Sequence, residues 1–223
     1  MGMQNYLSIR CPRGLLFAML GAMCSVLYAS EGAPGEGLTI TFRDKYVYVQ
    51  GSILRGDGAK FVQRMQNADV QCPLVRLNSG GGSGVDAVEI GTYIRRHRLA
   101  TWTDGLEDKC ASACNRIFAG GIIRIYSNAQ WIPTGKHKKL REGMLHGLGY
   151  HHPRHNGDFQ AAAPHYRANI VPYLKAMLPP EAFDWVYDTD THNLTPDMVW
   201  LNGDQALELG IATTDQVPSE CLP

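Results

Sequence analysis

Apolar and polar residues alternate over two short stretches that open the folded part of the chain. Residues 38–44 have the sequence LTITFRD and residues 45–53 have the sequence KYVYVQGSI. Alternation with a period of two is typical of strands that bury one face. The sequence therefore predicts two strands joined at Asp44 and Lys45.

Further along, the pattern switches between short apolar runs and helical spacing. Apolar runs predict strands over residues 73–79, 99–104 and 122–127. Helical spacing predicts helices over residues 57–67, 85–98, 112–121, about 158–177 and about 180–188. Strands that alternate with helices favour right-handed crossovers. We therefore expect an α/β fold with a largely parallel sheet in a single domain.

The first 29 residues have the features of a secretory signal peptide. Arg10 and Arg13 precede an apolar run from Leu15 to Ala29, and small and polar residues follow. The run is shorter than the roughly 20 residues of a membrane span. An uncleaved membrane anchor is the alternative, because Leu27 is unfavourable at the third position before a cleavage site after Ala29. The expected organisation is a signal peptide over 1–29, a leader over 30–37 and a domain over 38–223, in an exported protein, periplasmic or secreted.

Composition fits a globular protein that does not bind nucleic acid. Of the 223 residues, 44% are hydrophobic and 19% are charged, which suffices for a sizeable core. The 21 basic and 21 acidic residues cancel. Since no basic stripe interleaved with aromatic residues occurs, nucleic acid is excluded as a partner. Nothing in the sequence calls for a cofactor.

Cysteine usage agrees with an oxidising compartment. Cys72, Cys110, Cys114 and Cys221 remain after the signal peptide is removed, and four cysteines in such a compartment favour disulfides. Cys110 and Cys114 lie on either side of Ser112, where they form either a local bridge or two small buried residues. The sequence lacks the second cysteine pair that a structural zinc site would need, so no metal site is predicted.

Three features together predict acyl-transfer chemistry. The loop NSGGGSG, residues 78–84, follows a predicted strand and precedes a helix, so its amides can converge on an anion. Ser112 stands where another helix begins, and His146 follows two apolar residues in the sequence GMLHG, as a residue at the end of a strand would. Acyl transfer needs a nucleophile, a base and donors to the oxyanion. Each feature taken separately has an ordinary alternative. The glycine-rich segment could be a flexible loop, Ser112 a helix cap and His146 a structural histidine.

Four segments resemble the peptidase subunit of Clp proteases in order and approximate spacing: LNSGGGSGVDAVEIGTYIR, CASACNRIFAGG, MLHG and WLNGDQALELGIAT. The resemblance extends from about Val47 to Thr213. It is strongest to exported Clp-peptidase-like proteins of the ClpP/crotonase superfamily that carry a Cys-x-Ser-Ala-Cys motif. It implies a ClpP/crotonase-like fold of repeated ββα units.

The resemblance also implies a catalytic site. Ser112 would be the nucleophile and His146 the general base, while the amides of Gly81 and Ala113 would form the oxyanion hole. The carboxylate that orients the histidine would be Asp197, one position from the simplest alignment. Asp188 and Asp190 are its alternatives.

The same resemblance sets expectations about partners. It implies a peptide or protein substrate and a homo-oligomer. No ATPase partner is expected outside the cytoplasm. His151, His152 and His155 fall where the family builds an oligomer contact, in either a solvated loop or a metal site.

Two other functions compete with a serine peptidase. A non-catalytic exported protein could keep the fold as a binding or assembly module. An enzyme acting on coenzyme A esters fits poorly, because the acidic catalytic residues of the crotonase side are not evident.

Overall fold

The computed structural model describes residues 37–70, 73–136, 146–155, 157–193, 195 and 197–219. The predicted signal peptide, Cys72 and Cys221 lie outside these residues. Among the residues that are described, no helix is both long and apolar enough to cross a membrane.

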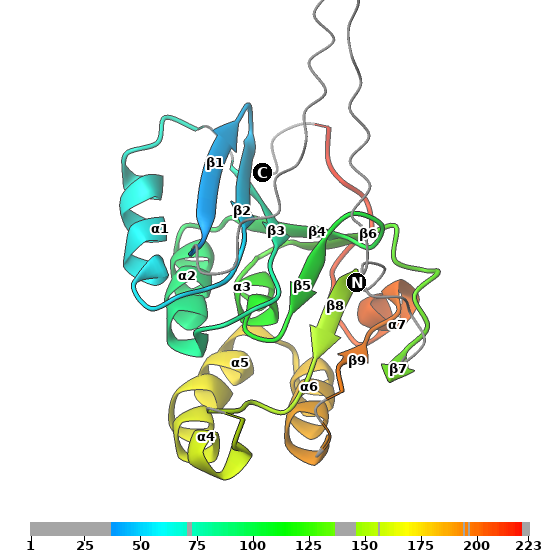
Figure 1. Ribbon diagram of the computed structural model, residues 1–223. Helices are drawn as coiled ribbons and strands as arrows, with labels where there is room; N and C mark the ends of the chain where they lie inside the picture. Colours follow the sequence, from blue (N-terminus) through cyan, green and yellow to red (C-terminus); the bar gives the residue numbers. More distant parts are fainter. Residues whose placement is uncertain are drawn as a thin grey trace, which may run out of the picture. The chain divides into compact units, whose positions relative to one another are not determined.

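A five-stranded sheet confirms the predicted α/β architecture (Figure 1). Its strands are β1 (Thr39–Arg43), β2 (Tyr46–Gln50), β3 (Leu74–Asn78), β4 (Ala100–Asp104) and β6 (Arg124–Ser127), in the order β1-β2-β3-β4-β6. Only the β1–β2 pair is antiparallel. The sheet is therefore largely parallel, as the alternation of strands and helices predicts.

Three helices pack beside one another along this sheet. They are α1 (Asp57–Gln66), α2 (Gly84–Arg96) and α3 (Cys114–Ala119). Helix α2 contacts both α1 and α3, and α3 contacts β3, β4 and a further strand, β5 (Lys109–Ala111). The buried side chains on these helices include Phe61, Ile90, Ile94 and Ile117. Helices α1 and α2 each turn an apolar stripe to the core, whereas every residue of α3 is buried.

A second, smaller sheet carries the elements that the hydrophobic pattern did not predict. Its strands β5, β8 (Gly147–Tyr150), β9 (Val199–Trp200) and β7 (Gly135–Lys136) follow the order β5-β8-β9-β7. Strands β5 and β8 are parallel, and the other pairs are antiparallel. Strand β8 contains only one large aliphatic residue, Leu148, between two glycines, so it lacks a strand-like alternation.

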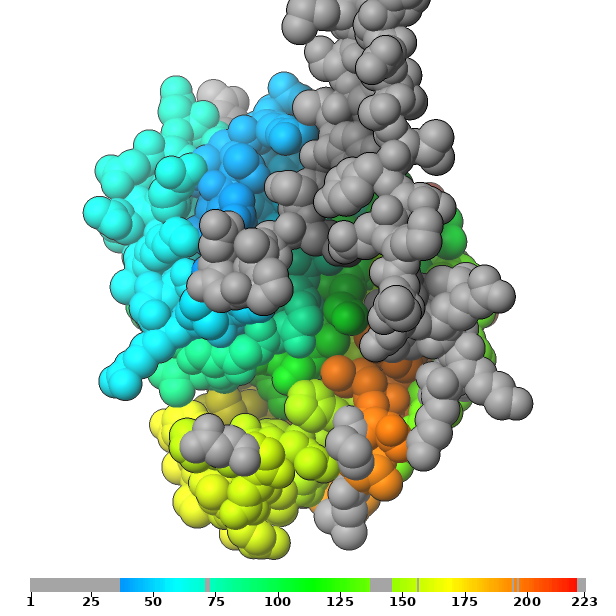
Figure 2. Space-filling model, viewed as in Figure 1, coloured from blue at the N-terminus to red at the C-terminus, as the bar shows by residue number. Residues whose placement is uncertain are grey.

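The chain after β8 forms helices close to the predicted positions. Helix α4 (Phe159–His165) continues through a π-helical turn (Tyr166–Ile170) into α5 (Val171–Met177), followed by α6 (Pro180–His192) and, after β9, by α7 (Gly203–Glu208). In Figure 2 the yellow-green segment after β8 is exposed on the viewed face, next to the yellow and orange helices. This segment is one wall of the cavity described below.

The glycine-rich loop between β3 and α2 is held on both sides by backbone hydrogen bonds. On one side, Ala111 N–H donates to the carbonyl of Ser79 at 3.0 Å. On the other, Ile53 N–H donates to the carbonyl of Gly81 at 2.9 Å, and Ser83 N–H donates to the carbonyl of Ile53 at 2.7 Å. The loop therefore joins β5 to the segment after β2 and is not a free turn.

Adjacent glycines in this loop should respond differently to an added methyl group. Gly81 has φ +98°, and a Cβ there would lie 2.6 Å from the carbonyl oxygen of Ala111 and 2.7 Å from Cβ of Ser112, whereas a Cβ on Gly80 would meet nothing within 4 Å. We expect Gly81→Ala to lower the free energy of unfolding by about 2 kcal/mol or more. Gly80→Ala, the matched control, should change it by less than about 1 kcal/mol. Urea unfolding of both variants measures this, and equal losses would contradict the description of the loop.

Candidate active site

Ser112 is held in a conformation that non-glycine residues rarely adopt. It follows β5 directly and has φ +57°, in the left-handed region. Its amide donates to the carbonyl of Gly149 in β8 at 2.8 Å, and Asn115 Nδ2 donates to the same carbonyl at 3.0 Å. Backbone strain of this kind persists only where the surroundings impose it, and it is concentrated at functional sites.

His151 is the residue that the structure places against this serine. It follows β8 directly, and its Nε2 lies 2.6 Å from Oγ of Ser112. Strands β5 and β8 are parallel neighbours, with Ala111 paired to Gly149. Because the carboxyl ends of parallel neighbours meet at one edge of a sheet, the residues just beyond them come together. The pair has the geometry of a nucleophile and a base within hydrogen-bond reach.

The structure does not bring His146, the base expected from the sequence, to Ser112. His146 precedes β8, whereas His151 follows it. Five residues of extended chain correspond to roughly 16 Å, so the two histidines lie at opposite ends of the strand. The expected strand before His146 falls in residues 137–145, outside the described part of the chain. The sequence has no strand pattern that would have indicated His151, because Gly147–Tyr150 lacks apolar alternation.

The surroundings of His151 favour its neutral, proton-accepting form. Burial lowers the pKa of its imidazole, and the positive charge of Arg116 lowers it further. A hydrogen bond to the backbone of His152 acts in the opposite direction. A neutral imidazole beside a hydroxyl is the form that a general base requires.

Arg116 connects the serine to helix α6. It is 4% exposed; its Nη1 donates to the carbonyl of Ser112 at 2.7 Å, and its Nη2 forms an ion pair with Asp190. Asp190 is fully buried and also accepts from the hydroxyl of Tyr166 at 3.0 Å. Burial raises the pKa of Asp190, while Arg116 and the Tyr166 hydroxyl act against that rise. This buried pair was not expected from the sequence, where Asp190 was only an alternative triad member.

The expected oxyanion-hole residues lie beside Ser112. An ideal Cβ on Gly81 would lie 2.9 Å from the amide nitrogen of Ala113, so the two backbones are in close contact. Ala113 caps helix α3 at its N-terminus, where amides have no acceptor within the helix. The amide of Gly81 donates to Oγ of Ser79 at 3.0 Å. An oxyanion at this point would share that donor with Ser79.

The three candidate carboxylates occupy different environments. Asp188 is exposed and accepts a 2.6 Å hydrogen bond from His192, away from the serine. Asp190 binds Arg116. Asp197 lies just before β9, and the β8–β9 register pairs Tyr150 with Val199. Continuing that register places Asp197 within one residue of the position opposite His151. In the described residues, no carboxylate is hydrogen-bonded to the His151 ring.

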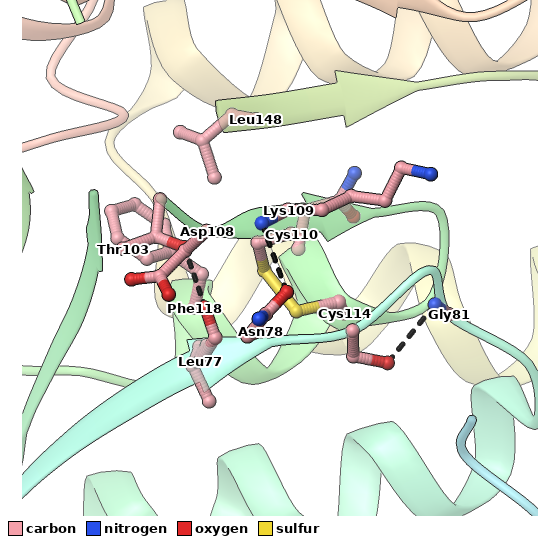
Figure 3. Close-up of a disulfide and its surroundings, with 12 residues drawn as sticks. Leu77, Asn78, Gly81, Thr103, Asp108, Lys109, Cys110, Cys114, Phe118 and Leu148 are labelled. Carbon is pink, nitrogen blue, oxygen red and sulfur yellow. Dashed lines mark hydrogen bonds between the residues drawn. A yellow bond between two sulfur atoms is a disulfide. The ribbon is translucent and has the colours of Figure 1, made fainter. Parts of the chain in front are cut away.

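A disulfide joins Cys110 in β5 to Cys114 in α3 (Figure 3). Both cysteines are fully buried. Figure 3 shows the bond beneath β8, close to Asn78 and Gly81 of the glycine loop. Since Ser112 lies between the two half-cystines, the bond restrains the backbone on both sides of the candidate nucleophile.

Ser112 and His151 open onto a cavity of about 560 Å³. The glycine loop and the start of α2 form one wall, and residues 153–155 with helix α4 and the π-helical turn form the other. Its size is in the range of small-ligand and substrate sites. Among the described residues, no group of three or more His, Cys, Asp or Glu side chains is arranged to hold a metal ion.

Comparisons with known proteins show the fold. No family model matches the chain, and no curated protein matches it. A variant of ClpP1 from Listeria monocytogenes is 16% identical, with a TM-score of 0.50, over 76% of this chain and 90% of that one. The ClpP protease catalytic domain from Plasmodium falciparum is 16% identical, with a TM-score of 0.52, over 80% and 88%. The 1510-N membrane-bound stomatin-specific protease, a variant in complex with a substrate peptide, is 16% identical, with a TM-score of 0.51, over 79% and 78%. The chain has a ClpP-like fold.

The disulfide should make a measurable contribution to stability. The bond joins residues four apart in sequence. By lowering the entropy of the unfolded chain, a bridge of this length stabilises the folded protein by about 2 kcal/mol. We expect the double variant Cys110→Ala, Cys114→Ala to lose about that much free energy of unfolding in urea. Dithiothreitol should destabilise the wild type by a similar amount and leave the variant unchanged. If the reductant destabilises both equally, the effect does not come from this bond.

The pKa of His151 should respond to Arg116. Burial and the Arg116 charge both disfavour the imidazolium, so a pH titration of the His151 NMR resonance should give a pKa below the usual value of about 6.5. Arg116→Met removes the charge and should raise that pKa.

The double variant Arg116→Met, Asp190→Asn removes the buried pair as a unit and is the matched control for loss of folding. A pKa that falls or stays constant in both variants would contradict the assigned electrostatics.

Proposed function

We propose that this protein is a serine peptidase in which Ser112 is the nucleophile and His151 the general base. The observation that carries the proposal is the 2.6 Å contact between Ser112 Oγ and His151 Nε2 at the edge of a cavity. The left-handed backbone of Ser112 and the lowered pKa of His151 support it. The proposal replaces His146 with His151 as the base.

Each residue has a defined part in the reaction. Ser112 Oγ attacks the carbonyl carbon of a peptide bond while its proton passes to His151 Nε2. The bond to the leaving nitrogen then breaks, and that nitrogen takes the proton from His151, which leaves an acyl ester on Ser112. A water molecule, deprotonated by His151, hydrolyses the ester and returns the proton to Ser112.

Backbone amides would stabilise the negative charge of each tetrahedral intermediate. The amides of Ala113 and Gly81 are the proposed donors, the second of them shared with Ser79 Oγ in this structure. Donors placed in advance at the developing charge are commonly a large contribution to catalysis. Asp197 is the proposed orienting carboxylate, on the basis of its position near His151 in the β8–β9 register.

The proposal includes export and self-assembly. The N-terminal sequence has signal-peptide features, and a disulfide beside the nucleophile is suited to an oxidising compartment. The resemblance to Clp peptidases supports a homo-oligomer that acts on peptides or proteins. No ATPase partner is expected in that compartment.

A fluorophosphonate probe tests the central assignment. The purified mature protein should be labelled, and both Ser112→Ala and His151→Ala should lower labelling by at least about 100-fold. His146→Ala is the matched control, because it removes a histidine at the other end of β8, and it should retain most of the labelling.

Two outcomes would contradict the assignment. If the folded wild type does not react, the protein is better described as a non-catalytic binding module with this fold. If His146→Ala abolishes labelling and His151→Ala does not, the base is the residue that the sequence resemblance indicated.

A further inference from the structure

The cavity beside Ser112 has a one-sided charge. Five of the described residues that line it have basic side chains: Arg116, His151, Arg154, His155 and His165. None of the described residues that line it is Asp or Glu. The remaining lining residues are glycines, serines and apolar side chains, apart from the buried Tyr166. A ligand in this cavity therefore meets two arginines and three histidines and no lining carboxylate.

Three acidic residues on or beside the lining elements form hydrogen bonds or an ion pair within the protein. Asp86, in the first turn of α2, accepts hydrogen bonds from the amides of Gly56 at 2.8 Å and Gly58 at 3.0 Å, and from the hydroxyl of Ser83. Asp190 is fully buried behind Arg116. Asp158 caps helix α4 through the amide of Gln160 at 2.8 Å.

Arg154 is the lining cation best placed to bind a substrate. Arg116 is buried and paired with Asp190, so its charge is compensated. Arg154 is exposed, and its hydrogen bond in the described structure is a long one, 3.5 Å from Nη1 to the carbonyl of Gly157. It has no ion pair among the described residues. It lies three residues beyond His151, on the wall that faces the glycine loop.

We infer that the cavity selects substrates with a carboxylate next to the bond that is cut, and that Arg154 is the residue that determines this selectivity. The inference rests on the proposed peptidase function of Ser112 and His151. A guanidinium binds a carboxylate through two parallel hydrogen bonds, which gives orientation as well as attraction. An acidic side chain and the free C-terminus of a peptide both supply this group.

Cleavage of matched peptides tests the inference. Three peptides that differ only in Glu, Gln or Lys on the acyl side of the scissile bond are compared by kcat/KM, together with C-terminally amidated versions of each. We expect Glu to exceed Gln by about three- to tenfold and Lys to be the poorest, because the contact is partly exposed. Arg154→Gln should reduce the ratio of kcat/KM for the Glu peptide to kcat/KM for the Gln peptide to less than twofold.

Arg167→Gln is the matched control, because Arg167 is an exposed arginine of the neighbouring π-helical turn that does not line the cavity. It should leave the preference unchanged. Faster cleavage of the Glu peptide than of the Gln peptide when both are amidated assigns the recognition to the acidic side chain. Faster cleavage of the free-acid peptides than of their amidated versions, whatever the acyl-side residue, assigns it to the C-terminal carboxylate. Either result supports the inference.

The failure of the inference is distinguishable from the failure of the proposed function. Fluorophosphonate labelling of Ser112 with equal cleavage of the Glu, Gln and Lys peptides, whether their C-termini are free or amidated, would overturn the selectivity and leave the peptidase intact. An equal loss of the Glu preference in Arg154→Gln and Arg167→Gln would contradict a specific contact with Arg154 and would indicate general electrostatic attraction. If Ser112 is not labelled at all, the failure lies with the proposed function.

Discussion

The parallel pairing of β5 with β8 is the constraint on which the candidate site depends. Each strand is only a few residues long, yet the register from Lys109–Gly147 to Ala111–Gly149 sets where both chains leave the sheet. Ser112 follows one strand and His151 follows the other, so their separation is a consequence of this register. A slip of either strand by one residue would turn its side chain to the other face, away from the residue that follows the neighbouring strand.

Other interactions hold that register and the serine within it. The disulfide ties β5 to α3, the glycine loop pairs with β5 through Ser79, and Arg116 joins the serine carbonyl to α6 through Asp190. A buried ion pair is weak evidence for stability, because desolvation opposes its Coulombic attraction. The contribution of the Arg116–Asp190 pair is geometric, because it links α6 to Arg116, and Arg116 also holds the carbonyl of Ser112.

The larger sheet and its helices could be predicted from the sequence because their patterns are local and strong. The alternation in β1 and β2 and the helical spacing in α2 determine those elements within a few residues of their observed ends. A small-residue loop before a helix and a run of glycines are also visible in the sequence, and the resemblance to Clp peptidases singled out Ser112, Gly81 and Ala113 within them. These residues lie together in the structure as the resemblance implied.

The base and the buried ion pair could not be predicted in the same way. Strand β8, with glycines at two of its four positions, has no apolar alternation to distinguish it, whereas the more apolar segment before His146 favours a strand there. The Arg116–Asp190 pair joins residues 74 positions apart, and nothing local to either residue indicates the other. Both depend on tertiary pairing and not on local preference.

The most direct test of the account is to locate the adduct that forms when the wild-type protein reacts with a phosphonate. Peptide mapping by mass spectrometry should find the added mass on the peptide that carries Ser112, with no adduct there when His151→Ala is treated in parallel. An adduct on another residue, or one on Ser112 that forms equally well without His151, would contradict the claim that the β5–β8 pairing assembles a nucleophile and its base.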